Sequence, residues 1–180
     1  MDTLDLPEID AGPYRLRAFG SFDIPLIQEV SSDSLIPLIS SVPTSNSEKE
    51  ALAFIKRQHH RLTEGAGYSF AIADAVSNKA VGQIGLWLKD HSQGRANIGY
   101  WVAPSHRRKG AVTHALGALA SWGLDQEGIH RLELYVEPWN EGSWRAAERS
   151  GFLREGLLRS WQDVGGKRKD MYMYAQLSAT

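Results

Sequence analysis

The stretch IGYWVAPSHRRKGA, residues 98–111, joins an apolar segment to a short basic loop that ends in a glycine. The apolar segment from Ala111 to Leu124 follows at once and has the spacing of a long helix. A strand, a basic loop and a helix in this order leave free main-chain N–H groups and the positive end of a helix dipole beside cationic side chains. The stretch therefore predicts a binding site for a phosphate or diphosphate group.

The segments on either side of this loop predict one mixed α/β domain over residues 1–180, with residues 1–12 as a loose tail. Strands are expected at residues 14–19, 68–75, 80–89, 96–102, 131–137, 152–162 and 169–177. Helices are expected at residues 22–31, 47–64, 111–124 and 142–150. Short turns between the second, third and fourth strands indicate an antiparallel meander, whereas the helix between the fourth and fifth strands implies a right-handed, locally parallel crossover.

Composition limits the classes of function. The chain has 180 residues, a net charge of −1 and no cysteine, which excludes disulfides, thiolate catalysis and thiolate metal sites. The near-neutral charge creates no field that would attract nucleic acid or an anionic membrane. The six histidines and their neighbouring carboxylates form no convincing metal set, so no metal is expected. Without a secretory signal pattern or an apolar segment of about 20 residues, the sequence predicts a cytoplasmic protein.

Four short motifs point to one protein family. They are Ile98-Gly99-Tyr100, Arg107-x-x-Gly110, Asn140-x-x-Ser143, and Gly151-Phe152 followed by Glu155-Gly156, with a weaker fifth formed by Gly166, Asp170 and Tyr174. In their order and spacing the chain resembles the GCN5-related N-acetyltransferase (GNAT) superfamily, and within it the ribosomal-protein N-terminal acetyltransferase type. The resemblance implies an α/β fold with a mostly antiparallel sheet of about seven strands and about four flanking helices. The sheet would be splayed between its fourth and fifth strands, with acetyl-CoA lying in the V.

The basic loop suits this cosubstrate. Main-chain amides of four consecutive residues would hold the diphosphate of acetyl-CoA, namely those of Arg108, Lys109, Gly110 and Ala111. Arg107 and Lys109 would add positive charge. The pantetheine arm contains amides and can pair like an extra strand with the exposed edge of Trp101 and Val102.

The resemblance also assigns two residues after the fifth strand. It implies that the side-chain amide of Asn140 helps to fix the cofactor and that Ser143 lies near the thioester sulfur. A neutral amine would attack the thioester directly, and Ser143 could protonate the departing thiolate. Ser143 is equally suited to begin a helix, which needs no chemistry. The acceptor is expected to be a peptide N-terminal α-amine or a small-molecule amine.

The sequence departs from the family pattern at four positions. Relatives often have glycine where Arg108 stands, glycine or alanine where Val112 stands, and glutamate where His114 stands. A catalytic glutamate known in some relatives would align near Gln162, which cannot act as a base. Asp163 follows it but would point to the opposite face of the strand. The general base is therefore unassigned.

Two other functions compete with acetyl transfer. A non-catalytic acyl-CoA-binding sensor or partner module of the same fold would need no base. A nucleotide-binding protein is disfavoured because neither G-x-x-x-x-G-K-[ST] nor G-x-G-x-x-G occurs in the chain. An exposed edge in the final hairpin would permit a homodimer.

Overall fold

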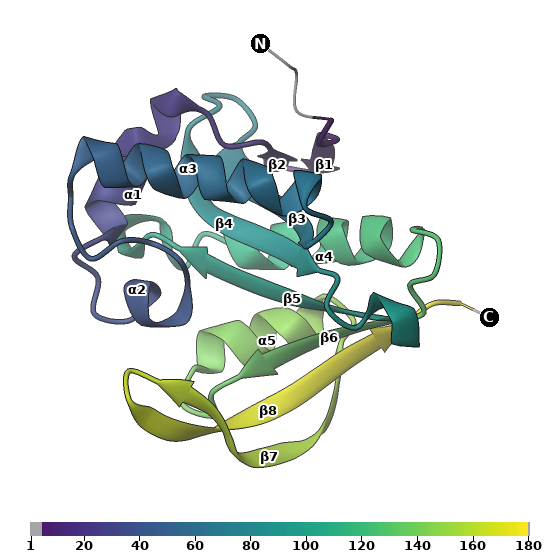
Figure 1. The fold of residues 1–180 in the computed structure, drawn as a ribbon. Helices are drawn as coiled ribbons and strands as arrows, with labels where there is room; N and C mark the ends of the chain where they lie inside the picture. Colours follow the sequence, from purple (N-terminus) through teal and green to yellow (C-terminus); the bar gives the residue numbers. More distant parts are fainter. Residues whose placement is uncertain (1–4, 180) are drawn as a thin grey trace.

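A single sheet of eight strands forms the centre of the computed structural model, which describes residues 5–179 (Figure 1). Its spatial order is β1 (Ile9–Ala11), β2 (Tyr14–Arg17), β3 (Gly67–Asp74), β4 (Ala80–Trp87), β5 (Arg95–Val102), β6 (Arg131–Val136), β8 (Lys167–Leu177) and β7 (Leu153–Val164). Neighbouring strands are antiparallel except β5 and β6. That pair is parallel because a helix connects the two strands, as expected.

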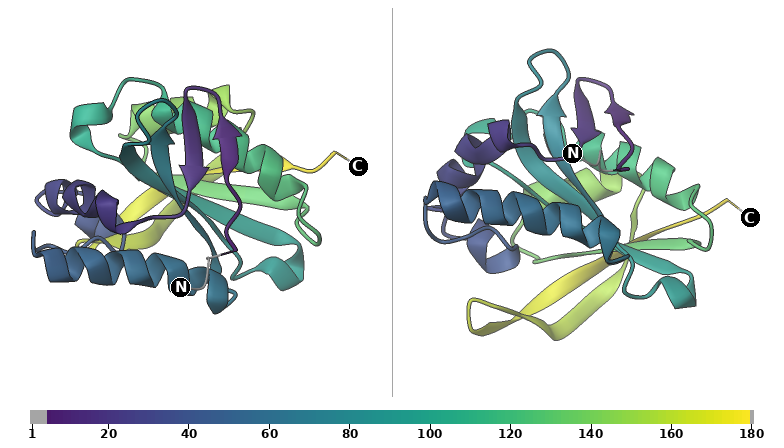
Figure 2. Two further views of the ribbon diagram at one scale, coloured as in Figure 1. Left: turned by 90° about the horizontal axis from the view of Figure 1, so that it is seen from above. Right: turned by 45° about the horizontal axis from the view of Figure 1, so that its top comes forward.

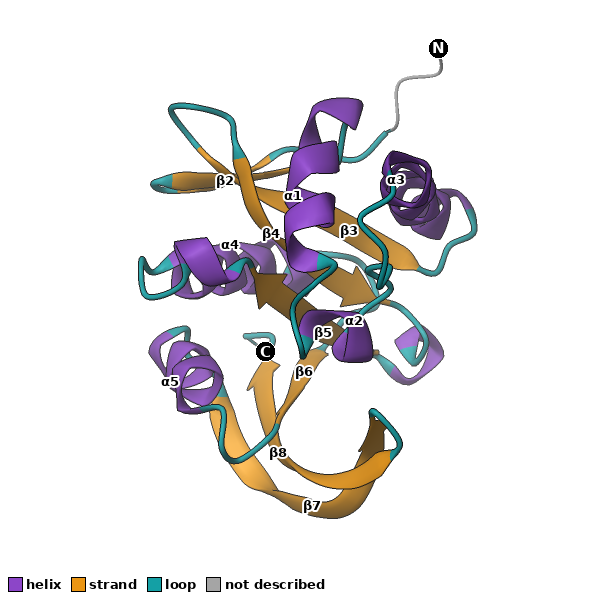
Figure 3. Cartoon of the chain, turned by 90° about the vertical axis from the view of Figure 1, so that its left-hand side faces the viewer, coloured by secondary structure: helices purple, strands orange, loops and turns teal. Residues whose placement is uncertain are grey.

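Helices cover both faces of the sheet (Figures 2 and 3). One face carries α4 (Ala111–Leu124) and α5 (Glu141–Arg149), and the other carries α1 (Ile24–Val30) and α3 (Glu48–Thr63). Between α1 and α3, α2 (Ile36–Ile39) is a single turn. Short 3₁₀ turns lie at Ser21–Asp23, His91–Gln93 and Pro104–His106. Within residues 5–179 no helix combines the length and apolar character needed to cross a membrane.

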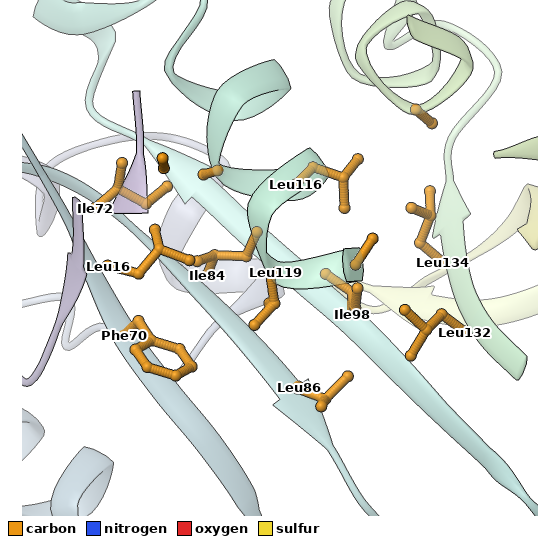
Figure 4. Close-up of a cluster of buried hydrophobic side chains, with 14 of the residues drawn as sticks. Leu16, Phe70, Ile72, Ile84, Leu86, Ile98, Leu116, Leu119, Leu132 and Leu134 are labelled. Carbon is orange, nitrogen blue, oxygen red and sulfur yellow. The ribbon is translucent and has the colours of Figure 1, made fainter. Parts of the chain in front are cut away.

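Two apolar cores separate these layers. The larger one packs α4 against the sheet and includes fully buried Leu116 and Leu119 (Figure 4). Alternate side chains of the same strands face the other way. Thus Ile98 joins the α4 core, whereas Trp101 joins the smaller core beneath α1 and α3. Each fully buried leucine contributes about 1.5–3 kcal/mol, which makes packing the main force that holds α4 on the sheet.

The splay between β5 and β6 is confirmed. Their register covers only Arg95↔Arg131, Ala96↔Leu132 and Asn97↔Glu133, so residues 98–102 of β5 have no partner strand on that side. β6 pairs along its whole length with β8 instead. The two halves of the sheet therefore diverge at one end, where β5 leads into the basic loop.

The sheet has one strand more than expected. Ile9–Ala11, within the segment expected to be a loose tail, pairs with β2 as β1. The hairpin turn that joins them is stabilised by Asp10, whose Oδ1 accepts the Gly12 N–H at 2.8 Å, and Gly12 adopts the left-handed conformation (φ 68°). The tail expectation is therefore wrong for these residues, while Met1 to Leu4 lie outside the described part of the chain.

The final hairpin is longer than expected and irregular. The register of β7 against β8 shifts between Leu158 and Gln162, and Ser160 has a φ of 49°. The Ser160 N–H donates to Asp170 Oδ1 at 2.7 Å, which fixes this bulge. A bulge bends a strand, and β7 and β8 curve together around the lower end of the molecule (Figure 3). As the outermost strand, β7 keeps one free edge, and the homodimer stays a prediction.

Candidate active site

The N-terminal end of α4 is open to an anion. Gly110 precedes the helix in the left-handed conformation (φ 80°), no side chain within residues 5–179 caps the helix, and its first turn has no acidic residue. The first N–H bonded within the helix is that of His114, which donates to the Gly110 carbonyl at 3.1 Å. The N–H groups of Ala111, Val112 and Thr113 therefore remain free to bind the oxygens of an anion.

The loop before α4 is held in place through polar contacts. The Tyr14 hydroxyl donates to the Lys109 carbonyl at 3.3 Å, and the Ser105 hydroxyl donates to Glu29 Oε1 at 2.7 Å. The Lys109 side chain itself is exposed. The main chain of the loop is thus fixed, while this cation stays available to a ligand.

Arg107 points away from the end of α4. Its Nε donates to the Val102 carbonyl at 3.2 Å, and its Nη2 lies 3.7 Å from Asp33 Oδ2. Asp33 also accepts the Leu35 and Ile36 N–H groups at 2.8 Å and so holds the turn that leads into α2. Arg107 therefore connects the loop to the segment just before α2 in this structure. Its contribution to diphosphate binding stays a prediction and requires the guanidinium to leave Asp33.

Arg108 has a φ of 62°, in the region that favours glycine. A side chain in this conformation costs about 1–2 kcal/mol. The preference of relatives for glycine at this position thus has a physical reason, because glycine removes that cost. In this chain the surrounding contacts of the loop must offset that cost, and the Arg108 side chain adds an exposed cation.

We expect Arg108→Gly to be more stable than Arg108→Ala by about 0.5–1 kcal/mol, because only alanine keeps the strained side chain. Both variants lose the same charge, so they should bind coenzyme A equally and somewhat more weakly than the parent chain. Urea unfolding and calorimetry measure the two quantities. Equal stabilities would show that residue 108 does not hold the left-handed conformation in solution.

The open side of β5 exposes only alternate main-chain groups. The Ala103 N–H donates to the Val81 carbonyl at 2.9 Å, so Ala103 and, two residues earlier, Trp101 direct their main-chain groups toward β4. Tyr100 and Val102 direct theirs toward the gap beside β6. The expected edge of Trp101 and Val102 is therefore corrected to Tyr100 and Val102, because main-chain direction alternates along a strand. The Val102 carbonyl is already bound by Arg107.

Ser143 and Tyr100 meet across this gap. The two hydroxyl oxygens lie 2.6 Å apart, and either can donate. Burial raises the pKa of Tyr100 to about 12, against the smaller opposing effect of its bond to Ser143. Tyr100 therefore keeps its proton at neutral pH and can donate it in the hydrogen bond to Ser143. The sequence motif included Tyr100 but gave no sign of this partner.

Asn140 has a structural contact of its own. It precedes α5, and its Oδ1 accepts the Ser143 N–H at 3.3 Å. Ser143 itself lies in the first turn of α5, so the helix-start residue is Asn140 rather than Ser143. The side-chain NH₂ group of Asn140 is not needed for this cap. Its expected contact with the cofactor stays a prediction.

A cavity of about 410 Å³ opens on the other side of the same β5 residues. Its walls come from α2 and the loop after it, the end of α3, the centre of the sheet and the bulged part of β7. The lining residues are Leu38, Ile39, Ser40, Ser41, Arg61, Gln83, Trp87, Gly99, Tyr100, Trp101 and Gln162. Because the cavity touches Tyr100 and Trp101, it reaches the strand whose free edge faces the gap.

A buried polar network fixes one wall of this cavity. Gln58 Oε1 accepts hydrogen bonds from Ser69 Oγ at 3.0 Å and from Gln83 Nε2 at 2.8 Å. Gln83 Oε1 in turn accepts the Trp101 indole N–H at 2.7 Å. Gln58, Ser69, Gln83 and Trp101 are each at most 5% exposed. Satisfied networks of this kind hold their members rigidly, so the position of Trp101 is defined before a ligand binds.

Among the described residues that line the cavity, none is a carboxylate or a histidine, so none can act as a general base. Gln162 lines the cavity, but its amide cannot accept a proton at neutral pH. The Asp163 carboxylate accepts the Gly166 N–H at 2.9 Å and so stabilises the hairpin turn. Glu133 is 2% exposed and is bound by Arg131 and Tyr135. Across residues 5–179 no three metal-ligating side chains come together.

Comparisons with known proteins agree with this geometry. The acetyltransferase (GNAT) domain family matches residues 14–153. An uncharacterised N-acetyltransferase of Bacillus licheniformis is 27% identical over 162 residues, covering 90% of this chain and 91% of the relative. The ribosomal-protein-serine acetyltransferase of Escherichia coli is 30% identical over 82 residues, or 46% of each chain. A GNAT-family acetyltransferase structure from Bacillus anthracis superposes with a TM-score of 0.80 at 25% identity, covering 96% of this chain and 99% of that one.

These similarities confirm the expected fold and the reaction class of N-acetyl transfer. They also agree with the resemblance to ribosomal-protein acetyltransferases. The match covers most of the chain, including the basic loop, α4 and the whole of α5. The chain belongs to the acetyltransferase (GNAT) domain family.

Proposed function

We propose that acetyl-CoA binds along the open edge of β5, with its diphosphate on the N-terminal end of α4, and that the acceptor is the α-amine of a peptide or protein N-terminus. The observation that carries the proposal is the divergence of β5 from β6 after three paired residues. It leaves a free strand edge between an uncapped helix and a cavity. The donor group and the acceptor amine can then reach the same β5 residues from opposite sides.

The residues at the gap fit acetyl-CoA. The free N–H groups of Ala111, Val112 and Thr113 suit a diphosphate. The free main-chain groups of Tyr100 and the N–H of Val102 suit the amides of the pantetheine arm. When bound, acetyl-CoA supplies a thioester whose carbonyl carbon is open to a neutral amine.

Ser143 and Tyr100 supply the proton in this scheme. Ser143 donates its proton to the sulfur as the C–S bond breaks and receives one from Tyr100. The proton that the attacking nitrogen loses as the amide forms passes through water to the Tyr100 oxygen, so both hydroxyls are protonated again, and the raised pKa of Tyr100 favours this return. Since the cavity offers no base, the ammonium form of the acceptor loses its proton to water. An α-amine, with an ordinary pKa of about 7.7–8.0, is well suited to this because a useful fraction is neutral near pH 7.

Two observations favour a peptide N-terminus over a polycationic small amine. The described lining of the cavity contains a cation, Arg61, and no acid that would attract several ammonium groups. The Escherichia coli relative is named as a ribosomal-protein-serine acetyltransferase, an enzyme for a protein acceptor. A peptide also brings main-chain carbonyls, which the donors of this cavity can bind.

Thiol release from acetyl-CoA with a panel of peptides and small amines tests the proposal. We expect Ser143→Ala to lower kcat about 10–100-fold and Tyr100→Phe to lower it less, with little change in the KM for acetyl-CoA. The rate should rise with pH as the acceptor amine deprotonates. It should show no decline below pH 10, because the pKa of Tyr100 is raised to about 12.

Ser121→Ala, on the exposed face of α4, is the matched control and should behave as the parent chain. An unchanged kcat in Ser143→Ala would remove the proton-donor role of Ser143. Binding of coenzyme A without thiol release for any amine would instead establish the non-catalytic acyl-CoA-binding module.

A further inference from the structure

One cation in the acceptor cavity has no anionic partner. Arg61, in the last turn of α3, lines the cavity, and its Nε donates to Gln58 Oε1 at 3.1 Å. Within residues 5–179 its two terminal nitrogens form neither a hydrogen bond nor an ion pair. The acid nearest in sequence, Glu64, lies 3.5 Å from His60. The guanidinium therefore has donors to offer to a ligand.

The surroundings of Arg61 leave its charge poorly compensated. Burial lowers the pKa of the guanidinium, the nearby charge of Arg57 lowers it further, and Glu64 opposes both effects. An arginine nevertheless remains charged at neutral pH. A partly desolvated cation of this kind gains from an incoming anion more than a cation in open water does.

Arg61 is also held in a defined position. Its guanidinium carbon lies 4.6 Å from the centroid of the Trp87 ring, which gives a cation–π contact. The indole lies against two glycines: a Cβ on Gly85 would be 2.1 Å from Trp87 Cζ2, and one on Gly99 would be 3.3 Å from Trp87 Nε1. Through Gln58, Arg61 is further connected to the buried network that positions Trp101.

We infer that the acceptor carries a carboxylate close to its amine and that Arg61 binds this carboxylate, so that Arg61 determines acceptor specificity. The planar guanidinium suits a bidentate contact with a carboxylate. The same cation repels polyamines and other polycations. The inference rests on the proposed function, since it assumes that the acceptor enters this cavity. Two sources of the carboxylate are possible: an acidic side chain near a peptide N-terminus, or the free α-carboxylate of a very short peptide or amino acid.

Matched acceptors separate these sources. In one arm, C-terminally amidated peptides beginning with serine carry Glu, Gln or Lys at position 2 or 3. In the other arm, seryl dipeptides carry either a free or an amidated C-terminus. For each acceptor, kcat/KM is measured with acetyl-CoA, and binding to the coenzyme A-loaded protein is measured by calorimetry, which decides the question without turnover.

We expect at least one arm to favour the carboxylate over its amide by about tenfold or more in the parent chain, with the Lys peptide poorest. Arg61→Gln should reduce this ratio to about one without changing the affinity for coenzyme A. Arg61→Glu should reverse the order of the Glu and Lys peptides. Lys56→Gln removes the same charge from an exposed position of the same helix and should leave the ratio intact.

The arm that shows dependence on Arg61 identifies the source of the carboxylate. A ratio near one in both arms of the parent chain overturns the inference, as does an equal ratio in Arg61→Gln and Lys56→Gln. Efficient acetylation of the neutral peptides in that case would leave the proposed function standing. Absence of acetylation and of binding for every acceptor would reject the proposed function itself, and with it the role of Arg61.

Discussion

Thr113→Glu is expected to unfold at a higher temperature than the parent chain and to bind coenzyme A at least tenfold more weakly. Thr113 lies in the first turn of α4, where no acidic residue is present. A carboxylate there interacts favourably with the helix dipole, by about 0.3–1 kcal/mol. It also repels a diphosphate bound to the same N–H groups. Two like charges about 5 Å apart at an effective dielectric constant of 20 repel by roughly 3 kcal/mol, which exceeds the 1.4 kcal/mol of a tenfold change.

Thr113→Gln is the matched control, because glutamine has the same side-chain length as glutamate but carries no charge. Thermal unfolding and calorimetric titration with coenzyme A measure the two effects. The loss of affinity should shrink as salt is added, since screening weakens the repulsion. If Thr113→Glu and Thr113→Gln bind coenzyme A alike, the diphosphate does not lie at the end of α4.

Gly82→Ala is expected to destabilise the fold by about 1–3 kcal/mol and to weaken coenzyme A binding. Gly82 lies on β4 directly opposite Val102, next to the open edge of β5. A Cβ at Gly82 would lie 2.3 Å from the Trp101 carbonyl oxygen and 3.0 Å from Val102 Cα. Both are main-chain atoms, so β5 must move away from β4 to make room. That movement displaces the edge on which the pantetheine arm is proposed to bind.

Gly117→Ala provides the control for this substitution. Gly117 lies inside α4, and a Cβ there would meet nothing within 4 Å. Alanine should therefore stabilise the chain by about 0.5–1 kcal/mol through its better helix propensity. Urea unfolding compares the two variants. A Gly82→Ala protein within 0.5 kcal/mol of the parent would contradict the tight contact between β4 and β5.

Local patterns were enough to predict most of the fold. The alternation of apolar and polar residues and the turn residues located seven of the eight strands, and the apolar segment after Gly110 located α4. The first strand was missed because Ile9–Ala11 is three residues long and gains its stability only by pairing with β2. A strand that short has too few residues to show a period.

The candidate site depends both on local sequence and on contacts between distant segments. The basic loop and its glycine were recognisable because a helix N-terminus is created by the residues that begin the helix. The direction of the Arg107 side chain could not be recognised from the sequence, because it depends on a contact with Asp33, which is far away in the chain. The partner of Ser143 likewise required β5 and α5 to be placed in space before Tyr100 could be found.

By itself, the sequence determined the order of the elements, the open end of α4 and the family, because hydrogen bonds and side-chain periodicity within a segment depend on neighbouring residues. Only the tertiary structure decided which main-chain groups of β5 stay free, and that the cavity beside β5 is lined by a cation rather than an acid. That cavity is assembled from α2, α3, β4, β5 and the bulged part of β7. Contacts between segments so far apart depend on strand register and packing, which no local pattern encodes.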